Sequence, residues 1–197
     1  MKNLEKKAKI WSKILGKLPG VRAIFLSGSV AANTGNENSD IDFFVVTKSG
    51  KIWTARFFIF LILKISGELA KPHRHARKIC PNHFIAEHAL EIAEKDAYAA
   101  NLFSKNRPLH DPQKIFENFV AANSWVEKFG EKFEISGAEK KIERKNSESF
   151  ENFLEKIQRA KIERNPDFGK SGAKIILNTD ELRFHPMPKN RGWKKPA

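Results

Sequence analysis

Two aspartates separated by a single residue are the strongest chemical feature of the sequence. Asp40 and Asp42 open an apolar stretch that continues to Val46. Side chains alternate between the two faces of a β-strand, so both carboxylates are expected on one face, with Ile41 and Phe43 on the other. Neighbouring carboxylates in apolar surroundings repel each other, and a bound cation relieves that repulsion. Mg²⁺ prefers oxygen ligands and leaves room for substrate phosphates, so the pair predicts a magnesium site.

A second polar feature comes shortly before these acids. Residues 23–26 are apolar and predict a buried strand, which ends in Ser27-Gly28-Ser29. A turn-rich segment, residues 33–39, then leads to the aspartates. The alternative interpretation is a β-hairpin with an acidic tip rich in Gly and Asn. Turn chemistry explains such a tip without any ligand, but it does not explain two acids on one face of so apolar a strand.

These two features together resemble a known signature. Gly28-Ser29 followed, after a gap, by Asp40-Ile41-Asp42-Phe43 resembles the motif of the polymerase beta nucleotidyltransferase superfamily. That motif is a hydrophobic residue, Gly, and Gly or Ser, and then an Asp-hydrophobic-Asp-hydrophobic strand. The resemblance covers little more than residues 26–43, and its specificity comes from both halves occurring together, each on a predicted strand.

The resemblance implies a fold, an activity and a set of site residues. It implies an α/β (α+β) fold, with a small mixed sheet flanked by helices. The expected reaction moves a nucleoside monophosphate from a nucleoside triphosphate to a hydroxyl acceptor and releases pyrophosphate. Asp40 and Asp42 are the expected catalytic, Mg²⁺-binding residues, and Ser27, Gly28 and Ser29 are expected to bind the nucleotide. Gly28 is expected to let the backbone approach a phosphate closely.

The resemblance also implies a third acid, and here the sequence departs from it. Many superfamily members place a third carboxylate on the strand beside the paired acids. Alternation predicts that Cys80, Asn82 and Phe84 share one face of that strand. Asn82 is therefore the residue at the third position, and its amide can offer an oxygen but cannot take up a proton. Glu87 and Glu91 are nearby alternatives.

Arg56 is a further candidate ligand. It lies in an otherwise apolar predicted helix, residues 52–69, shortly after the acidic strand. A guanidinium is planar and always charged, which suits phosphate binding. The alternative is an arginine that reaches the surface or pairs with an acid.

The remaining elements follow from periodicity and turn signals. An amphipathic helix is predicted from Leu4 to Leu18, and a third strand over residues 78–85, where Pro81 indicates an edge or an irregularity. Residues 87–129 are expected to be helical, with breaks at Arg107-Pro108 and Asp111-Pro112. Three later features are predicted: a helix capped by Ser147, its end near Asn165-Pro166, and a short strand over residues 174–178.

These elements suggest three parts. Residues 1–105 are expected to form the nucleotidyltransferase domain, and residues 106–186 a mainly helical C-terminal region. The Pro-, Lys- and Gly-rich residues 187–197 are expected to be disordered.

The charge of the chain suggests a polyanionic partner. The net charge is +13 and the isoelectric point is about 9.8. Lys and Arg outnumber acids seven to one in residues 1–27, five to one in residues 64–79 and seven to two in residues 170–197. If these segments converge near the site, RNA or another phosphorylated acceptor is expected. If they do not, the charge serves solubility.

The composition also bears on location. The longest apolar run, residues 57–63, is far shorter than the roughly 20 residues of a membrane span. A single cysteine, Cys80, excludes an internal disulfide and fits a reducing compartment. A cytoplasmic protein with no membrane partner is therefore expected.

Three interpretations besides the enzyme remain open. The first is a nucleotide-binding protein that has lost catalysis, which fits the missing third acid. The second is an antitoxin-like role of the kind that minimal nucleotidyltransferases play beside helical partners. The third is a basic RNA-binding module. For the enzyme itself, the sequence does not identify the acceptor, and RNA and protein are the candidates.

Overall fold

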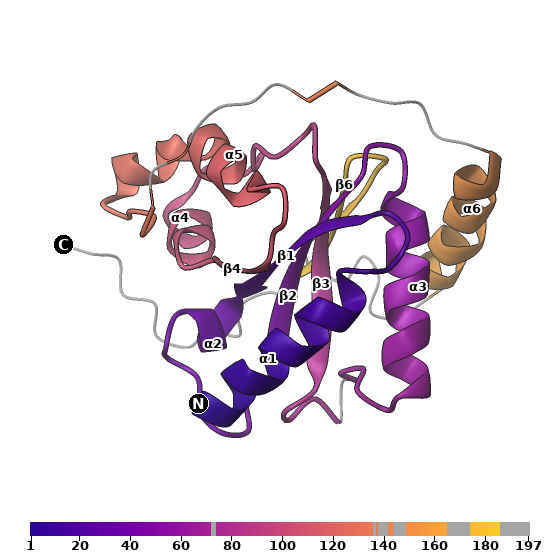
Figure 1. Cartoon of the computed structure of the whole chain (residues 1–197). Helices are drawn as coiled ribbons and strands as arrows, with labels where there is room; N and C mark the ends of the chain where they lie inside the picture. Colours follow the sequence, from indigo (N-terminus) through magenta and orange to yellow (C-terminus); the bar gives the residue numbers. More distant parts are fainter. Residues whose placement is uncertain (72–73, 136, 138–141, 144–148, 165–173, 186–197) are drawn as a thin grey trace.

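The computed structural model describes residues 1–71, 74–135, 137, 142–143, 149–164 and 174–185. A six-stranded sheet in the order β4-β1-β2-β3-β6-β5 forms its centre (Figure 1). The strands are β1 (Val21–Ser27), β2 (Ile41–Thr47), β3 (Ile79–Ala86), β4 (Arg107–His110), β5 (Lys174–Leu177) and β6 (Glu181–His185). The helices are α1 (Lys2–Leu15), α2 (Gly28–Ala31), α3 (Ile52–Ile65), α4 (Ala97–Ser104), α5 (Ile115–Ala122), the 3₁₀ helix η1 (Ser124–Phe129) and α6 (Ser149–Glu163). The predicted mixed α/β architecture is confirmed.

The central three strands position the predicted site. β1 and β2 are antiparallel, and their register sets Ser27 opposite Asp42. β2 and β3 are parallel, which requires a crossover connection, and α3 provides it. The sequence between β1 and β2 thus joins antiparallel neighbours, as the hairpin interpretation expected, but it also contains the short helix α2.

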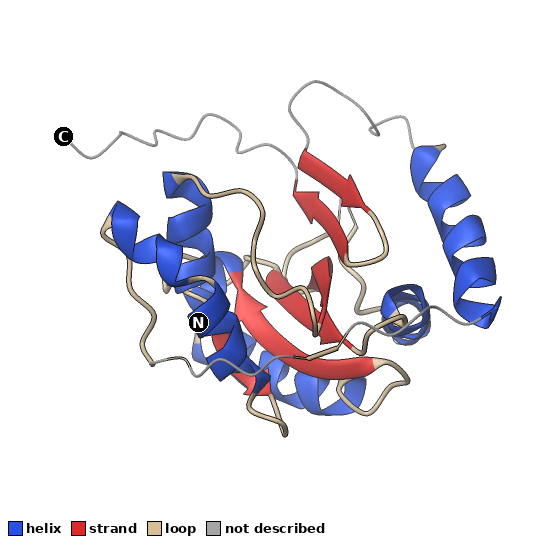
Figure 2. Ribbon diagram, turned by 90° about the horizontal axis from the view of Figure 1, so that it is seen from above, coloured by secondary structure: helices blue, strands red, loops and turns tan. Residues whose placement is uncertain are grey.

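Helices cover both faces of the sheet and enclose two apolar cores (Figures 1 and 2). One core packs α1, α3 and α6 against one face, and the other packs α4, α5 and η1 against the opposite face. Because side chains alternate between the two faces of the sheet, β2 contributes residues to both cores. Ile41, Phe43 and Val45 belong to the first core, and Phe44 and Val46 belong to the second. Asp42 therefore faces the layer that contains α4.

The segment expected to be mainly helical contributes three of the six strands. β4 lies at one edge of the sheet beside β1, and β6 pairs with β3 and carries β5 at the other edge. Pro108, taken as a helix breaker in the sequence, lies within β4, where an edge position tolerates a residue without an N–H donor. The predictions for Ser147, Asn165-Pro166 and residues 187–197 fall outside the described residues.

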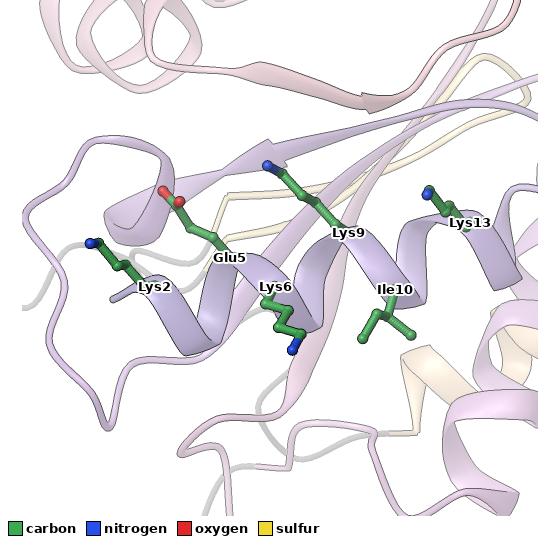
Figure 3. Close-up of a pocket in the computed structure, with 6 residues that line it drawn as sticks. All are labelled: Lys2, Glu5, Lys6, Lys9, Ile10 and Lys13. Carbon is green, nitrogen blue, oxygen red and sulfur yellow. The ribbon is translucent and has the colours of Figure 1, made fainter.

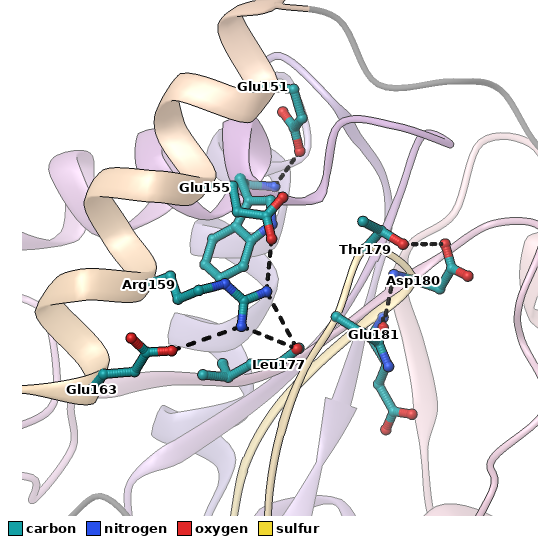
Figure 4. Close-up of polar contacts among 10 residues, drawn as sticks. Glu151, Glu155, Arg159, Glu163, Leu177, Thr179, Asp180 and Glu181 are labelled. Carbon is teal, nitrogen blue, oxygen red and sulfur yellow. Dashed lines mark hydrogen bonds and ion pairs between the residues drawn. The ribbon is translucent and has the colours of Figure 1, made fainter.

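A buried carboxylate on α6 holds the start of α3 (Figure 4). Glu151 is 2% exposed, and its two oxygens accept the main-chain N–H groups of Trp53, at 2.6 Å, and Thr54, at 3.0 Å. The Thr54 hydroxyl also donates to Glu151. No side chain of α3 itself caps this end, so Glu151 supplies the acceptor that a helix start lacks.

We expect Glu151→Ala to lower the free energy of unfolding by about 3 kcal/mol, because two buried N–H donors would lose their acceptor. For a chain of this size, that is a fall of about 10 °C in Tm. The matched control is Glu155→Ala on the same helix. Glu155 pairs with Arg159 at a partly exposed site, so its loss should cost less than about 1 kcal/mol. Thermal unfolding of both variants compares them, and equal losses would contradict the capping role.

Exposed large apolar side chains concentrate on the layer formed by α1, α3 and α6. Eight such residues lie there: Ile10, Ile14, Phe57, Leu61, Ile65, Phe150, Phe153 and Ile157. In the described part of the chain, none of the helices is both long enough and apolar enough to cross a membrane.

Candidate functional site

Three potential ligand groups converge where β2 and β3 begin. Asp40 directly precedes β2, Asp42 is its second residue, and Cys80 is the β3 residue paired with Asp42. One ligand atom from each of the three residues lies within 4.8 Å of the other two. The sequence predicted the two carboxylates together, and the structure adds a thiol beside them.

An irregularity in β3 changes the faces of the residues that follow Asn82. The register shifts after the pair Phe43 and Pro81, so that Phe44 pairs with His83. Asn82, which precedes the shifted pair, keeps the face of Cys80 that alternation predicted, and its Nδ2 donates to Asp42 Oδ1 at 2.7 Å. The prediction that Cys80, Asn82 and Phe84 share one face is therefore correct for Cys80 and Asn82 and wrong for Phe84, which lies in the opposite core, against α3.

Gly28 lies directly against Asp42. Its φ of +65° is in the left-handed region that favours glycine. A Cβ atom at this position would lie 2.1 Å from Asp42 Oδ2 and 2.8 Å from its Cγ. The sequence predicted that Gly28 admits a phosphate. The structure supplies a separate requirement, which is room for the Asp42 carboxylate.

A pocket of about 430 Å³ opens over the cluster. Its size is within the range of small-molecule sites. It is lined by Ser27, Gly28, Ser29, Ala32, Thr34, Asp40, Asp42, Cys80, Asn82, Tyr98, Asn101, Leu102, Lys105 and Phe184. All the predicted site residues except Arg56 are therefore brought together in one pocket. The sequence did not predict the wall formed by α4, because the helical pattern there does not reveal which face meets the acids.

Glu131 holds the α4 wall in position. Its carboxylate accepts from Asn101 Nδ2 at 2.7 Å, from the Ser104 hydroxyl at 3.2 Å and from Lys105 Nζ at 2.8 Å. The hydrogen bond from Lys105 is the main cause that holds the pKa of Glu131 below its usual value. Two pocket-lining side chains, Asn101 and Lys105, are thus tied to one acid.

Arg56 does not line the pocket. Its Nη1 donates to Gln158 Oε1 on α6 at 2.7 Å, and its Cζ lies 4.2 Å from the ring centre of Phe60 and 5.2 Å from that of Phe184. Burial lowers the pKa of Arg56 to about 10. The arginine therefore packs within the protein against Gln158, so it matches neither the phosphate-ligand interpretation nor the alternative of reaching the surface or pairing with an acid.

The two acids considered as substitutes for a third carboxylate also lie elsewhere. Glu87 accepts from the main-chain N–H of Ser49 and pairs with Arg22, and Glu91 pairs with Lys95. Among the described residues that line the pocket, Asp40 and Asp42 are the only acids. Cys80 and Asn82 occupy the neighbouring strand, where the superfamily resemblance implied an acid.

The basic side chains form a separate feature. A hollow of about 290 Å³ on α1 is lined by Lys2, Glu5, Lys6, Lys9, Ile10 and Lys13 (Figure 3). All six come from one helix, and none of them lines the pocket over the aspartates. Within the described part of the pocket lining, Lys105 is the sole basic residue. Among the residues that the structure describes, no basic side chain of the three lysine- and arginine-rich segments lines the pocket over the acids.

Burial and the neighbouring negative charges raise the pKa values of Asp42 and Cys80. Burial, followed by the negative charge of Asp40, raises the pKa of Asp42 to about 7, although the hydrogen bond from Asn82 acts in the opposite direction. Burial and the two aspartates also raise the pKa of the Cys80 thiol well above its usual value. A cation would reverse both effects by neutralising the charge that is costly here.

This shift makes the stability of the cation-free protein depend on pH. The folded protein holds a proton on Asp42 up to a pH of about 7, whereas the unfolded chain releases it near pH 4. We therefore expect the contribution of Asp42 to stability to fall as the pH rises from about 4 to about 8. Asp42→Asn should flatten that part of the profile. Thermal unfolding of both proteins across this range measures the difference, and identical profiles would contradict it.

The residues present fit a divalent cation. Two carboxylates face the same point, and the absence of a side chain at Gly28 leaves space beside Asp42 Oδ2. Asn82 donates to the other oxygen, Oδ1, which fixes the orientation of the carboxylate. Asp40 and Asp42 would therefore hold the ion.

Comparison with known proteins complements this geometry. Residues 5–101 match the family model described as a nucleotidyltransferase domain, a range that includes both aspartates, Cys80 and Asn82. A solved structure described as a crystal structure of a toxin-antitoxin with AMP-PNP is similar to the chain at 17% sequence identity and a TM-score of 0.38. That similarity covers 62% of this chain and 86% of the other. No curated protein matches the chain.

Proposed function

Because residues 5–101 belong to the nucleotidyltransferase domain family of the polymerase beta superfamily, we propose that the protein transfers a nucleoside monophosphate to a hydroxyl acceptor. The donor is a nucleoside triphosphate, and pyrophosphate is released. One observation carries the proposal: Asp40, Asp42 and the Ser27-Gly28-Ser29 turn, which are separate in the sequence, line the same pocket.

Each group has a defined part in this proposal. Asp40 and Asp42 hold a divalent cation, for which the sequence predicts Mg²⁺. When bound, the cation would neutralise part of the negative charge of the phosphates. Ser27, Gly28 and Ser29 contact the phosphates and orient the α-phosphorus for attack by the acceptor hydroxyl. The α4 wall, distant in the sequence but adjacent in space, confines the rest of the nucleotide or the acceptor.

The test is transfer of label from a nucleoside triphosphate labelled at the α-phosphate, with Mg²⁺ or Mn²⁺ and with cellular RNA and protein as separate acceptors. We expect label in one acceptor pool. A γ-labelled substrate should leave both pools unlabelled, because its label leaves with pyrophosphate. Transfer of γ-label instead would identify a phosphoryl transferase and contradict the proposal.

A second candidate is nucleotide binding without transfer. Asn82 favours it, because this residue donates to Asp42 in the place where an acid would serve as base. That candidate predicts that a nucleoside triphosphate with a divalent ion raises Tm while no label moves to any acceptor.

An RNA-binding module and an antitoxin-like protein would behave differently. The RNA-binding module predicts binding that weakens steeply with salt and survives the loss of both aspartates. The lysines of α1 would be its surface, since they lie apart from the pocket. An antitoxin-like role would instead require a protein partner.

A further inference from the structure

We propose that Cys80 is the third ligand of the cation site and that its sulfur shifts the preference of the site from Mg²⁺ toward a thiophilic divalent ion such as Zn²⁺ or Co²⁺. The inference rests on the cation site of the proposed function and deepens it. It assigns the role of metal ligand to Cys80, a residue to which the sequence alone gave no part in metal binding.

The placement of Cys80 follows from the sheet itself. Neighbouring residues of paired strands project to the same face, and Cys80 is the direct partner of Asp42 in the parallel β2–β3 pair. Its sulfur and the two carboxylates lie within 4.8 Å of one another. Cys80 also lines the pocket, so an ion entering from solvent would meet all three groups.

Cys80 and Asn82, the two polar residues of β3 beside Asp42, have different roles. Asn82 donates its amide N–H to Asp42 Oδ1 and so orients that carboxylate. An amide nitrogen that donates in this way is not a cation ligand, whereas the adjacent sulfur can be one. We assign Asn82 as a positioning residue and Cys80 as the ligand.

The donor set has a chemical consequence. Mg²⁺ takes oxygen ligands and binds thiolate poorly, whereas Zn²⁺ and Co²⁺ accept mixed sulfur and oxygen sets. Three protein ligands with positions left open are also the arrangement found in catalytic zinc sites. When such an ion binds, the thiol proton is released to solvent and a sulfur–metal bond takes its place.

The sequence makes the test unambiguous, because Cys80 is the single cysteine of the chain. Co²⁺ is the probe, titrated into the full-length protein after removal of any affinity tag. Coordination by sulfur produces a sulfur-to-cobalt charge-transfer absorption in the near ultraviolet, which oxygen ligands do not. We expect this absorption to saturate at one ion per chain and to be displaced by Zn²⁺ but not by a similar concentration of Mg²⁺.

Two variants complete the test. Cys80→Ser replaces sulfur by oxygen with little change in size, and it should lose the absorption and bind Zn²⁺ at least roughly tenfold more weakly. Cys80→Asp supplies the missing carboxylate and should bind Mg²⁺ more tightly than the wild type does. Circular dichroism checks that both variants fold. If Cys80→Ser does not fold, the Mg²⁺ affinity of Cys80→Asp, compared with that of the wild type, still tests the role of Cys80.

The outcomes separate this inference from the proposed function. Saturable Co²⁺ binding without the charge-transfer band would overturn the role of Cys80 and leave the cation site intact. Nucleotidyl transfer with Mg²⁺ and no measurable Co²⁺ binding would do the same. Absence of both cation binding and transfer would overturn both.

Discussion

Replacing Asp42 with Asn is expected to reduce nucleotidyl transfer by at least about a hundredfold, because the variant loses a charged ligand of the ion that stabilises the developing phosphate charge. The substitution keeps the shape of the side chain and an oxygen that can accept from Asn82. The loss should therefore arise from chemistry rather than from unfolding. Initial rates with α-labelled nucleotide measure it.

The same variant is expected to be at least as stable as the wild type above a pH of about 7. The raised pKa of Asp42 shows that its negative charge is unfavourable in the folded protein, and an uncharged amide removes that cost. Higher stability together with lower activity is the result expected for a group that serves function although it destabilises the folded protein. Thermal unfolding and transfer rates on the same preparation test both halves.

Asp180→Asn is the matched control. It makes the same change at the turn between β5 and β6, where Asp180 pairs with His88 outside the pocket. Its transfer rate should match that of the wild type. If Asp42→Asn keeps full activity in parallel with this control, the two aspartates are not the ligands that the reaction requires.

The sequence predicted the parts of the site that depend on local spacing. Asp40 and Asp42 alternate along one strand, and the Ser27-Gly28-Ser29 turn ends the preceding one, so the recognisable signature lies within residues 26–43. The superfamily resemblance that rests on this signature is confirmed by the family match. β1 and β2 are consecutive strands, so their pairing brings Ser27 opposite Asp42 without contacts from distant parts of the sequence.

The parts that the sequence did not predict depend on register between distant segments. Pro81 did signal an irregularity, but only the paired strands show that it leaves Asn82 on the face of Cys80 and sends Phe84 to the other core. The prediction for Arg56 used distance along the chain from the acids, whereas α6 supplies its actual partner, Gln158.

Gly28→Ala is the second substitution with a large expected effect, and it tests the space beside the carboxylate. The new methyl group would lie 2.1 Å from Asp42 Oδ2, so the carboxylate or the turn must move. A displacement of about 1 Å in a catalytic group can cost roughly a hundredfold in rate. We expect transfer to fall by about that factor and the rise in Tm caused by a divalent ion to be lost.

Gly67→Ala separates that displacement from backbone strain. Gly67 has a φ of +69°, close to the +65° of Gly28, but a Cβ there would meet no atom within 4 Å. Both variants place an alanine in the left-handed region, so both should lose about 1 kcal/mol of stability from strain alone. Only Gly28→Ala should also lose the ion-dependent rise in Tm. If both variants keep it, Gly28 does not protect the Asp42 carboxylate, and if both lose it, strain in the backbone rather than contact with Asp42 explains the need for glycine.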